Sequence, residues 1–482
     1  MFLGIDIGTS SVKALLLDCN GVIIDQKTHP LTLQRPRALW SEQTPDDWWQ
    51  AVDQTVRAID ARSRASVQAI GLSGQMHGAV VLGKDDQPLR AAILWNDGRA
   101  QPQCATLLQT APRTWEITGN PVLAGFTAPK LVWMQENEPE VFAAIRSVLL
   151  PKDWLRLRMT GEKVSDMSDA SGTLWLDVRQ RRWSPEMLAA TRLSESMMPR
   201  LVEGSEVSSQ LSAAVAEQWG MARVPVAGGG GDNAAGAIGL GVVRPGETFL
   251  SLGTSGVIFT VTDGFQPRPE SGVHAFAHAV PKTWHRMSVM LSASACLDWA
   301  ANLTGSASVP ALLDIALDAD PHSDLLFLPY LSGERTPHAD PSARGVFFGM
   351  TGRTGPAELA RAVLEGVAMG LRDGLDVLTG AGTDIIEINM AGGGSRSELW
   401  GRILAATLGR PLVWHQGGDT GPALGAARLA QVAAGAGSLG EVCKAPQITA
   451  RVDPDEALED VMRERQERFR SLYRAVSPLW RA

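Results

Sequence analysis

The first stretch that carries chemistry is "FLGIDIGTSSVK", in which an acid stands just before a turn of small residues. Such a turn offers backbone N–H groups and hydroxyls to an anion. Thr9, Ser10 and Ser11 would supply these donors, and Lys13 either reaches a phosphate or is solvated on a strand. Asp6 would repel an anion. It therefore either bonds nearby backbone N–H groups, as Asp often does beside turns, or works with a cation.

A second copy of this pattern occurs in the other half of the chain. "ETFLSLGTSGVIFTV" repeats the opening residues, with Gly253 and Thr254 at the turn as a further place for a phosphate. Ser251 stands where the first copy has Asp6. The turn can therefore be made without an acid, which favours a chemical role for Asp6.

The segment "VPVAGGGGDNAAGAIG" predicts a strand, a glycine turn and a helix that begins near Asp232 and Asn233. Asp232 could simply cap the helix, as Asp prefers to do. The pattern G-x-G-x-x-A at 229–234 also fits a dinucleotide fingerprint, but a hairpin follows where a second strand ending in an acid is expected. In the third interpretation Asp232 is the base that takes a proton from an acceptor hydroxyl, while Asp6 holds Mg²⁺ through water.

A third glycine site, "INMAGGGSRSELW", also predicts a strand, glycines and a helix. Gly392 and Gly393 would let the backbone pass close to a flat base or ribose. Ser397 follows them at the expected start of the helix. The chain contains no G-x-x-x-x-G-K-[ST] pattern, which excludes a P-loop enzyme.

Four further residues have both a structural and a functional interpretation. His77, in "GQMHG", is either a structural histidine or a contact to sugar hydroxyls, because a neutral imidazole offers one donor and one acceptor. Met76 fills gaps as readily as it lines sites. Trp95 is one of 15 tryptophans, most of which must pack in cores. Lys130 is either a surface lysine or a partner that holds site carboxylates in place.

The elements that must position these residues follow from periodicity and turn residues. The opening residues predict two strands joined by the turn, and "GVIIDQKTH" predicts a third. A helix is expected over "TPDDWWQAVDQTVRAIDA", with Thr44 as its N-cap and Pro45 at its first position. "VHAFAH" has the spacing of some zinc sites but lacks the accompanying glutamate and a third ligand, so it is interpreted as a strand.

The repeated strand, glycine turn and helix predict an α/β protein with ligands at strand ends. One glycine-turn hairpin in each half predicts two duplicated domains that face each other across a cleft. We place the boundary between 1–244 and 245–482, with sugar on the first domain and nucleotide on the second. The last helix is placed back against the N-terminal domain.

Composition limits the partners and the compartment. The 482 residues carry a net charge of −8 without a block of Lys or Arg, which argues against nucleic acid or an anionic membrane as partners. The four cysteines are far apart and form no CxxC pair, which fits a reducing compartment. No signal-peptide pattern and no apolar run near the ~18 residues of a membrane span is found, so a cytoplasmic protein is expected.

Five segments in order resemble the FGGY family of carbohydrate kinases, which has an actin-like, ribonuclease H-like fold of two duplicated domains around a cleft. "GIDIGTSSVK" and "GGGGDNAAGAIG" are similar to its two phosphate segments, and "AGGGSRSELW" to its adenosine segment. "GFTAPKLVWMQEN" and "GVFFGMTGRTGPAELARAVLE" are similar to its extended motifs. "GLSGQMHGAVVL" and "ILWNDGR" resemble the members that act on a ketopentose.

This resemblance implies ATP with Mg²⁺ as the donor, a ketopentose as the acceptor, and a homodimer. Asp232 would be the base, and Asp6 would assist the metal and the phosphates. The implied sugar site contains Met76, His77, Asn233, Trp95, Asp97 and Lys130, and the implied nucleotide contacts are Thr254, Gly392 and Gly393. Ser397 departs from the Asn of many relatives, which leaves base specificity less certain. A sister kinase for another ketose or polyol, or a chaperone-like ATPase of the same fold, remains open.

Overall fold

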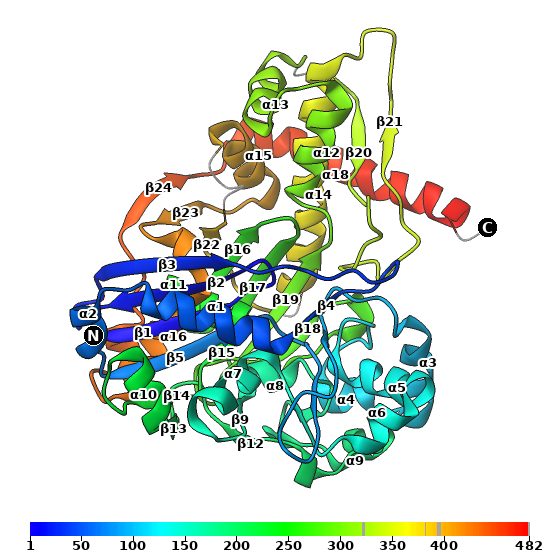
Figure 1. Ribbon diagram of the computed structural model, residues 1–482. Helices are drawn as coiled ribbons and strands as arrows, with labels where there is room; N and C mark the ends of the chain where they lie inside the picture. The colour runs from blue at the N-terminus through cyan, green and yellow to red at the C-terminus, as the bar shows by residue number, and fades with distance from the viewer. Residues whose placement is uncertain (321–322, 381, 393–396, 481–482) are drawn as a thin grey trace.

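The computed structural model describes residues 1–320, 323–380, 382–392 and 397–480. Two large mixed sheets, one from each half of the chain, form the centres of two lobes (Figure 1). The first sheet has the order β13 (Val207–Gln210), β14 (Pro225–Ala227), β5 (Ala69–Gly74), β1 (Phe2–Ile7), β2 (Ser11–Leu17), β3 (Ile23–Pro30), with β15 (Gly230–Gly231) paired to β5. The second has the order β18 (His274–Ala277), β19 (Trp284–Met290), β17 (Gly256–Thr262), β16 (Thr248–Leu252), β22 (Ile388–Ala391), β23 (Leu412–His415), β24 (Ile448–Val452).

The two sheets share one pairing pattern, which confirms the predicted duplication. In the first, β3, β2 and β1 are antiparallel neighbours, β1, β5 and β14 are parallel, and β13 is antiparallel to β14. In the second, β19, β17 and β16 are antiparallel, β16, β22 and β23 are parallel, and β24 is antiparallel to β23. The strand before each glycine turn thus lies at the centre of its sheet.

The two turn hairpins differ by one residue in their pairing. Asp6 pairs with Lys13 across the first hairpin, and the N–H of Gly8 donates to the carbonyl of Ser11. In the second hairpin Ser251 pairs with Val257. Val257 corresponds to Val12 of the first copy, which is one residue before Lys13. The sequence repeat is therefore in register along the chain, whereas the first turn encloses one more residue than the second.

The helices of the first half cover its sheet and build the outer part of that lobe. They are α1 (Pro45–Arg57), α2 (Ala61–Ala65), α3 (Gln101–Thr110), α4 (Thr114–Thr118), α5 (Thr127–Asn137), α6 (Pro139–Ala144), α7 (Pro151–Thr160), α8 (Met167–Ser171), α9 (Pro185–Ala190), α10 (Ala213–Trp219) and α11 (Asp232–Leu240). α1 buries Trp48, Val52 and Val56, which recur every four residues on one face. The hydroxyl of Thr44 makes no cap bond to this helix and instead accepts from the amide of Gln34.

The second half contributes the remaining helices. Short strand pairs complete both lobes. The helices are α12 (Ala295–Thr304), α13 (Val309–Ile315), α14 (Pro356–Thr379), α15 (Glu398–Leu408), α16 (Gly421–Ala433), α17 (Leu439–Val442) and α18 (Glu456–Val476). The strand pairs are β4 (Glu42–Gln43) with β7 (Ala92–Ile93), β6 (Val80–Leu82) with β8 (Ser147–Leu149), β9 (Val164–Asp166) with β12 (Arg200–Val202), β10 (Leu176–Asp177) with β11 (Arg182–Trp183), and β20 (Leu326–Leu328) with β21 (Val346–Phe348). Within the described ranges, no single helix is long and apolar enough to cross a membrane, although α12 and the segment Val309–Asp318, bent by 72°, meet those criteria as a pair.

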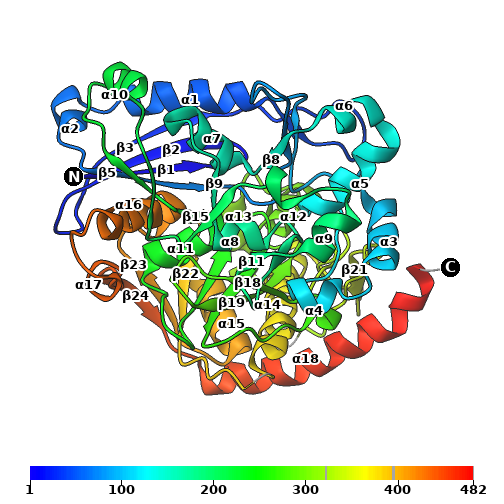
Figure 2. The same ribbon diagram turned by 90° about the horizontal axis from the view of Figure 1, so that it is seen from below.

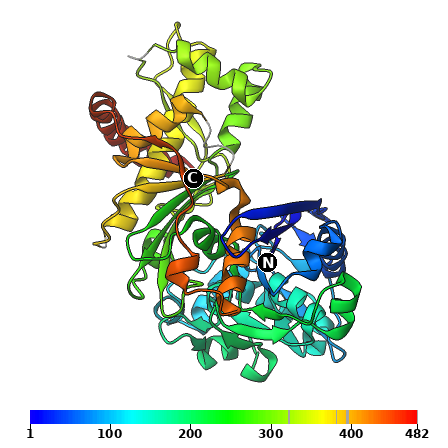
Figure 3. The same cartoon turned by 90° about the vertical axis from the view of Figure 1, so that its left-hand side faces the viewer.

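The segment that returns to the first sheet is α16, whereas we expected the last helix to do so. α16 contacts β1, β5 and α11, and Figure 3 shows it, in orange, between the two lobes. The last helix, α18, contacts α14, α15 and β20 of the second half, and Figure 2 shows it on the far side of the molecule from β1 to β3. The domain boundary between 244 and 245 remains a prediction. If the chain is divided there, α16 of the second half packs on the sheet of the first half.

Glycines allow this close contact between α16, α11 and the first sheet. A Cβ on Gly4 would lie 2.0 Å from the carbonyl oxygen of Ala423, and one on Gly71 would lie 1.8 Å from that of Ala426. On the other face of α16, a Cβ on Gly425 would lie 1.7 Å from the carbonyl oxygen of Ala235 in α11. These distances are far below van der Waals contact, so any side chain would force the backbones apart.

We expect Gly71→Ala to destabilise the protein by about 2 kcal/mol or more, because the sheet and α16 must separate to admit the methyl group. The measurement is thermal unfolding of the purified variant. Gly440→Ala in α17 is the control, since its Cβ would meet no atom within 4 Å. An unfolding temperature of Gly71→Ala equal to that of the control would contradict the close contact.

Candidate functional site

Three adjoining cavities form a groove between the two halves of the chain. The inner cavity, about 220 Å³, is lined by Met76, His77, Trp95, Phe126, Asp232, Asn233, Ser251, Gly253, His274, Phe276 and Arg335 among others. The middle cavity shares Asp232, Asn233 and Ser251 with it, and shares Gly392 and Gly418 with the outer cavity. The outer cavity also contains Ser397, Trp414 and Ala450. The groove therefore runs from an enclosed inner end, past Asp232, to the third glycine site.

Asp232 stands where the inner and middle cavities meet. It is the first residue of α11, and Gly231, not Asp232, occupies the N-cap position. One carboxylate oxygen accepts from the backbone N–H and the side-chain amide of Asn233, at 2.8 and 3.0 Å. Burial, followed by repulsion from Asp6, raises the pKa of Asp232 to about 7. A carboxylate that binds a proton near neutral pH suits a general base.

Asp6 is a second acid close enough to act on the charge of Asp232, although it is not among the residues that line the three cavities. It lies on β1, and its Oδ1 is buried without a hydrogen-bond partner among the described residues. Burial raises the pKa of Asp6 to about 6, although Ser73 and Lys13 act in the opposite direction. Two carboxylates whose pKa values are raised by burial, one of which raises the pKa of the other, make a favourable place for a cation.

His77 is held in a strained turn so that its ring forms the wall of the inner cavity. Its φ is +68°, which is uncommon for a residue other than glycine. Its Nδ1 lies 2.6 Å from the carbonyl oxygen of Gly172, and burial lowers the pKa of the ring to about 3. A carbonyl only accepts, so Nδ1 carries the proton and Nε2 is left as an acceptor.

Lys130 and Asp97 stand behind the wall of the inner cavity instead of lining it. The ammonium of Lys130 is fully buried and donates to the carbonyls of His77 (2.7 Å) and Gly125 (2.8 Å). Asp97 is buried against Arg99, with nitrogen–oxygen distances of 2.7 to 3.0 Å, and also accepts from the N–H of Ser41. Burial lowers the pKa of Lys130 well below its usual value. Lys130 thus holds the His77 turn, whereas Asp97 is bound to Arg99 and Ser41, and neither side chain is among those that line the inner cavity.

The first turn reaches the groove through Trp95. The indole N–H of Trp95 donates to the hydroxyl of Thr9 at 2.9 Å, and that hydroxyl donates to Gln75 at 3.0 Å. Trp95 also lines the inner cavity and is 36% exposed. Ser10 is exposed at the tip of the turn, next to the partly buried Ser11. A hydrogen bond from Trp95 thus connects the first turn to the wall of the inner cavity.

The nucleotide-type residues lie toward the outer end of the groove. Gly392 lines the middle and outer cavities with a φ of +88°, and a Cβ there would meet the carbonyl oxygen of Leu252 at 2.7 Å. Ser397 lines the outer cavity, and its hydroxyl caps α15 by accepting from the N–H of Trp400. Thr254 is exposed at the second turn. Gly393 lies outside the described residues.

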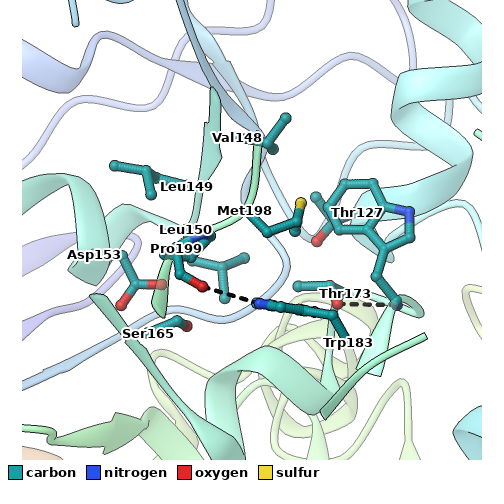
Figure 4. A pocket seen from close by; sticks show the side chains of 11 residues that line it. Thr127, Val148, Leu149, Leu150, Asp153, Ser165, Thr173, Trp183, Met198 and Pro199 are labelled. Carbon is teal, nitrogen blue, oxygen red and sulfur yellow. Dashed lines mark hydrogen bonds between the residues drawn. The ribbon is translucent and has the colours of Figure 1, made fainter. Parts of the chain in front are cut away.

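A buried charge cluster supports α8, which lies beside the Asp232 turn. Lys152 contacts Asp153 at 2.6 Å, Asp166 at 3.0 Å and Asp169 at 3.5 Å, and all four side chains are fully buried. In the same helix the hydroxyl of Ser168 accepts from the N–H of Gly231, one residue before Asp232. Figure 4 shows Asp153 at a small cavity of about 10 Å³, which is too small for a sugar. The cluster is a support for the groove, separate from it.

Several residues of the inner cavity were not singled out from the sequence. Arg335, Phe126 and Phe276 line it, and the ring centroids of His77 and Phe126 are 4.5 Å apart. His274, correctly predicted to lie on a strand, also lines this cavity, and its Nδ1 lies 3.2 Å from the side-chain oxygen of Asn120. Phe126 lies in the quoted segment "GFTAPKLVWMQEN" but was not assigned a role, and neither a glycine turn nor the repeat marks Phe276 or Arg335.

The raised pKa of Asp232 predicts a pH-dependent gain in stability for Asp232→Asn. The folded state binds the proton of Asp232 more tightly than the unfolded chain, so stability is lost as pH rises from the unfolded pKa of 3.8 to about 7, and the full cost is present above that. We expect the unfolding temperature of Asp232→Asn, measured with EDTA, to exceed that of the wild type by roughly 2–4 °C at pH 8. The gain should vanish near pH 3, where the carboxyl is mostly protonated in both states.

Asp97→Asn is the matched control, since this buried acid has a compensating partner in Arg99. It should lower the unfolding temperature at pH 8, because Arg99 loses one of its carboxylate partners. A loss of stability in Asp232→Asn at pH 8, or an equal gain at both pH values, would contradict the unfavourable burial of Asp232.

Comparison with known proteins identifies the family. Residues 1–239 match the N-terminal domain of the FGGY family of carbohydrate kinases, and residues 248–434 match its C-terminal domain. The chain is 54% identical to the xylulose kinase of Escherichia coli K12, covering 99% of this chain and all of that protein, and 56% identical to the xylulose kinase of Klebsiella pneumoniae, covering 90% of each. A crystal structure of a xyloylose kinase from Brucella ovis, 47% identical, superposes with a TM-score of 0.96 over 99% of both chains. The chain belongs to the FGGY family of carbohydrate kinases.

Proposed function

We propose that this kinase transfers the γ-phosphoryl group of ATP to the 5-hydroxyl of D-xylulose and releases D-xylulose 5-phosphate and ADP. The observation that carries the proposal is the position of Asp232, which lines both the inner and the middle cavity. A base at this junction can reach a hydroxyl bound on one side and a phosphate bound on the other. Relatives that share more than half of its residues are xylulose kinases, which supports this acceptor.

The inner cavity has the polar groups that a small sugar requires. His77 Nε2 can accept a hydrogen bond from one hydroxyl, and the side-chain amide of Asn233 can donate to or accept from another. The rings of Phe126 and Phe276 provide apolar surface for C–H groups. With a volume of about 220 Å³, the cavity suits a small sugar better than a larger ligand.

Asp232 performs the proton transfer in the proposed step. Its carboxylate takes the proton of the 5-hydroxyl as the new oxygen–phosphorus bond forms and the bond between the γ-phosphorus and the bridging oxygen breaks. That bridging oxygen leaves as part of ADP. The N-terminus of α11 presents backbone N–H groups and a partial positive charge at the same place, which stabilises negative charge on the phosphates.

The middle and outer cavities suit the nucleotide. Gly392 and Gly418 connect the two cavities without side chains, so that a triphosphate can pass close to the backbone. The outer cavity offers Trp414, Ala450 and Val452 as apolar surface for a base, with Ser397 at its edge. With this arrangement the adenosine would lie on the second half of the chain and the acceptor mainly on the first.

We propose that Mg²⁺ accompanies the nucleotide and that Asp6 holds it through water. The buried, unpartnered Oδ1 of Asp6 fits this role. No group of three or more potential ligands that could hold a metal ion occurs in the described ranges, which is compatible with an ion bound mainly by phosphates and water. When bound, Mg²⁺ would neutralise negative charge on the phosphates.

The homodimer and the cytoplasmic location remain predictions, testable by light scattering and by cell fractionation.

Asp232→Asn should lower kcat for D-xylulose by about 10³-fold, because an amide cannot take the proton. The measurement is ADP release in a coupled assay, together with calorimetry to show that D-xylulose still binds. Asp47→Asn, an exposed acid on α1, is the control and should match the wild type. Wild-type turnover in Asp232→Asn would contradict the assignment.

The same assay with D-ribulose, other ketoses and polyols separates the proposed acceptor from those of sister kinases. ADP release that is unaffected by every sugar would indicate an ATPase.

Asp6→Asn should raise the concentration of Mg²⁺ needed for half-maximal activity by about tenfold, since a neutral amide attracts the hydrated ion less strongly. The measurement is a Mg²⁺ titration at fixed ATP and saturating D-xylulose. Asp47→Asn again serves as the control. An unchanged Mg²⁺ requirement in Asp6→Asn would exclude a role for this carboxylate in holding the ion.

A further inference from the structure

We propose that Arg335 determines specificity in the inner cavity by binding an acceptor-only oxygen at the end of the sugar away from the reacting hydroxyl. In a ketose this oxygen is the carbonyl of the open-chain form. The same guanidinium would bind the carboxylate of a sugar acid, so aldonates should occupy the cavity as competitive inhibitors. The inference rests on the proposed sugar-kinase function.

The backbone around Arg335 is fixed by bonds on both sides. On one side, the carboxyl Oε1 of Glu334 accepts from the N–H of Arg335 at 2.6 Å and of Leu291 at 3.0 Å. On the other, Thr336 donates its N–H to the carbonyl of Val289 and accepts the N–H of Val289 on its hydroxyl, each at 3.1 Å. The backbone of Arg335 is therefore fixed against the end of β19, so the point from which its side chain extends into the cavity is well defined.

The side chain, in contrast, makes no hydrogen bond or ion pair with the residues in the described ranges. Arg335 lines the inner cavity, and its charge acts on two other lining residues, His77 and His274. Glu334 is the adjacent acid, but its carboxyl accepts from backbone N–H groups, and burial raises its pKa to about 8. Glu334 attracts Arg335 electrostatically, but within the described ranges its carboxyl makes no hydrogen bond or ion pair with the guanidinium. A half-buried guanidinium whose donors are unused in the protein indicates a ligand that supplies acceptors.

The other polar groups of the cavity indicate which part of a ligand Arg335 would bind. Asp232 and Nε2 of His77 are acceptors, so they suit sugar hydroxyls as donors. His77 and His274 are both kept neutral because burial lowers the pKa of each ring. Arg335 is thus the cation of this cavity and has only donors to offer. A carbonyl or carboxylate oxygen, which only accepts, matches Arg335 better than a hydroxyl does.

Arg335 also adds a contact from the second half of the chain to a cavity built largely by the first. It lies in the loop between β20 and β21, whereas His77 and Trp95 belong to the first half. A sugar bound by both Arg335 and His77 would connect the two halves across the groove.

The test compares Arg335→Met, Arg335→Lys and the wild type with three probes. The probes are D-xylulose as substrate, xylitol as the polyol without a carbonyl, and D-xylonate as inhibitor. We expect Arg335→Met to raise the KM for D-xylulose by 10- to 100-fold and to abolish inhibition by D-xylonate. The affinity for xylitol should differ from that of the wild type by no more than about twofold. Arg335→Lys should retain part of the D-xylonate inhibition, because it keeps the charge and loses the forked geometry.

Arg344→Met, an exposed arginine of the same loop, is the matched control and should behave as the wild type with all three probes. Thermal unfolding checks that each variant is folded. If Arg335→Met binds D-xylonate as the wild type does, or loses D-xylulose and xylitol equally, the inference is overturned. If the wild type phosphorylates no sugar at all, the proposed function fails instead, and D-xylonate binding by calorimetry still reports on Arg335.

Discussion

The fold of this kinase depends on the close approach of α16 to the first sheet and to α11. Gly4 and Gly71 on the sheet side, and Gly425 in α16 itself, leave no space for a side chain between the backbones. α11 begins at Asp232, and α16 begins at Gly421, which lines the middle cavity. The contact therefore brings the N-termini of two helices to one point of the groove. A binding site for phosphates at the junction of the two halves is a direct consequence of this packing.

Charge compensation separates the groove from its supports. In the Lys152 cluster and the Asp97–Arg99 pair, each buried cation has carboxylate partners in direct contact, and both groups hold the walls in place. Asp6, Asp232 and Arg335 form no ion pair of this kind among the described residues, and for the two acids burial outweighs the groups that stabilise their charge. The protein gives up stability at these three positions, and a bound cation, an acceptor hydroxyl and a sugar oxygen would each restore part of it.

The sequence predicts the duplicated sheets and the place of Asp232 well, because glycine turns and strand periodicity are local signals. It does not predict the partners of Lys130, since a buried lysine that donates to two backbone carbonyls has the same local sequence as an exposed one. Thr44 likewise has the pattern of a helix cap, but tertiary contact with Gln34 takes its hydroxyl. Arg335 reaches the groove through a loop fixed by long-range bonds, which no window of sequence contains.

The two copies of the fold differ where the chemistry is. Asp6 on β1 corresponds to Ser251 on β16, and the α11 N-terminus carries Asp232 where the α16 N-terminus has Gly421. The first copy thus supplies both acids. In the second copy the corresponding positions are small or lack side chains, and they leave space for a phosphate chain. Like charges on both sides of the groove would repel a triphosphate from both faces, so an active site between duplicated domains requires this asymmetry.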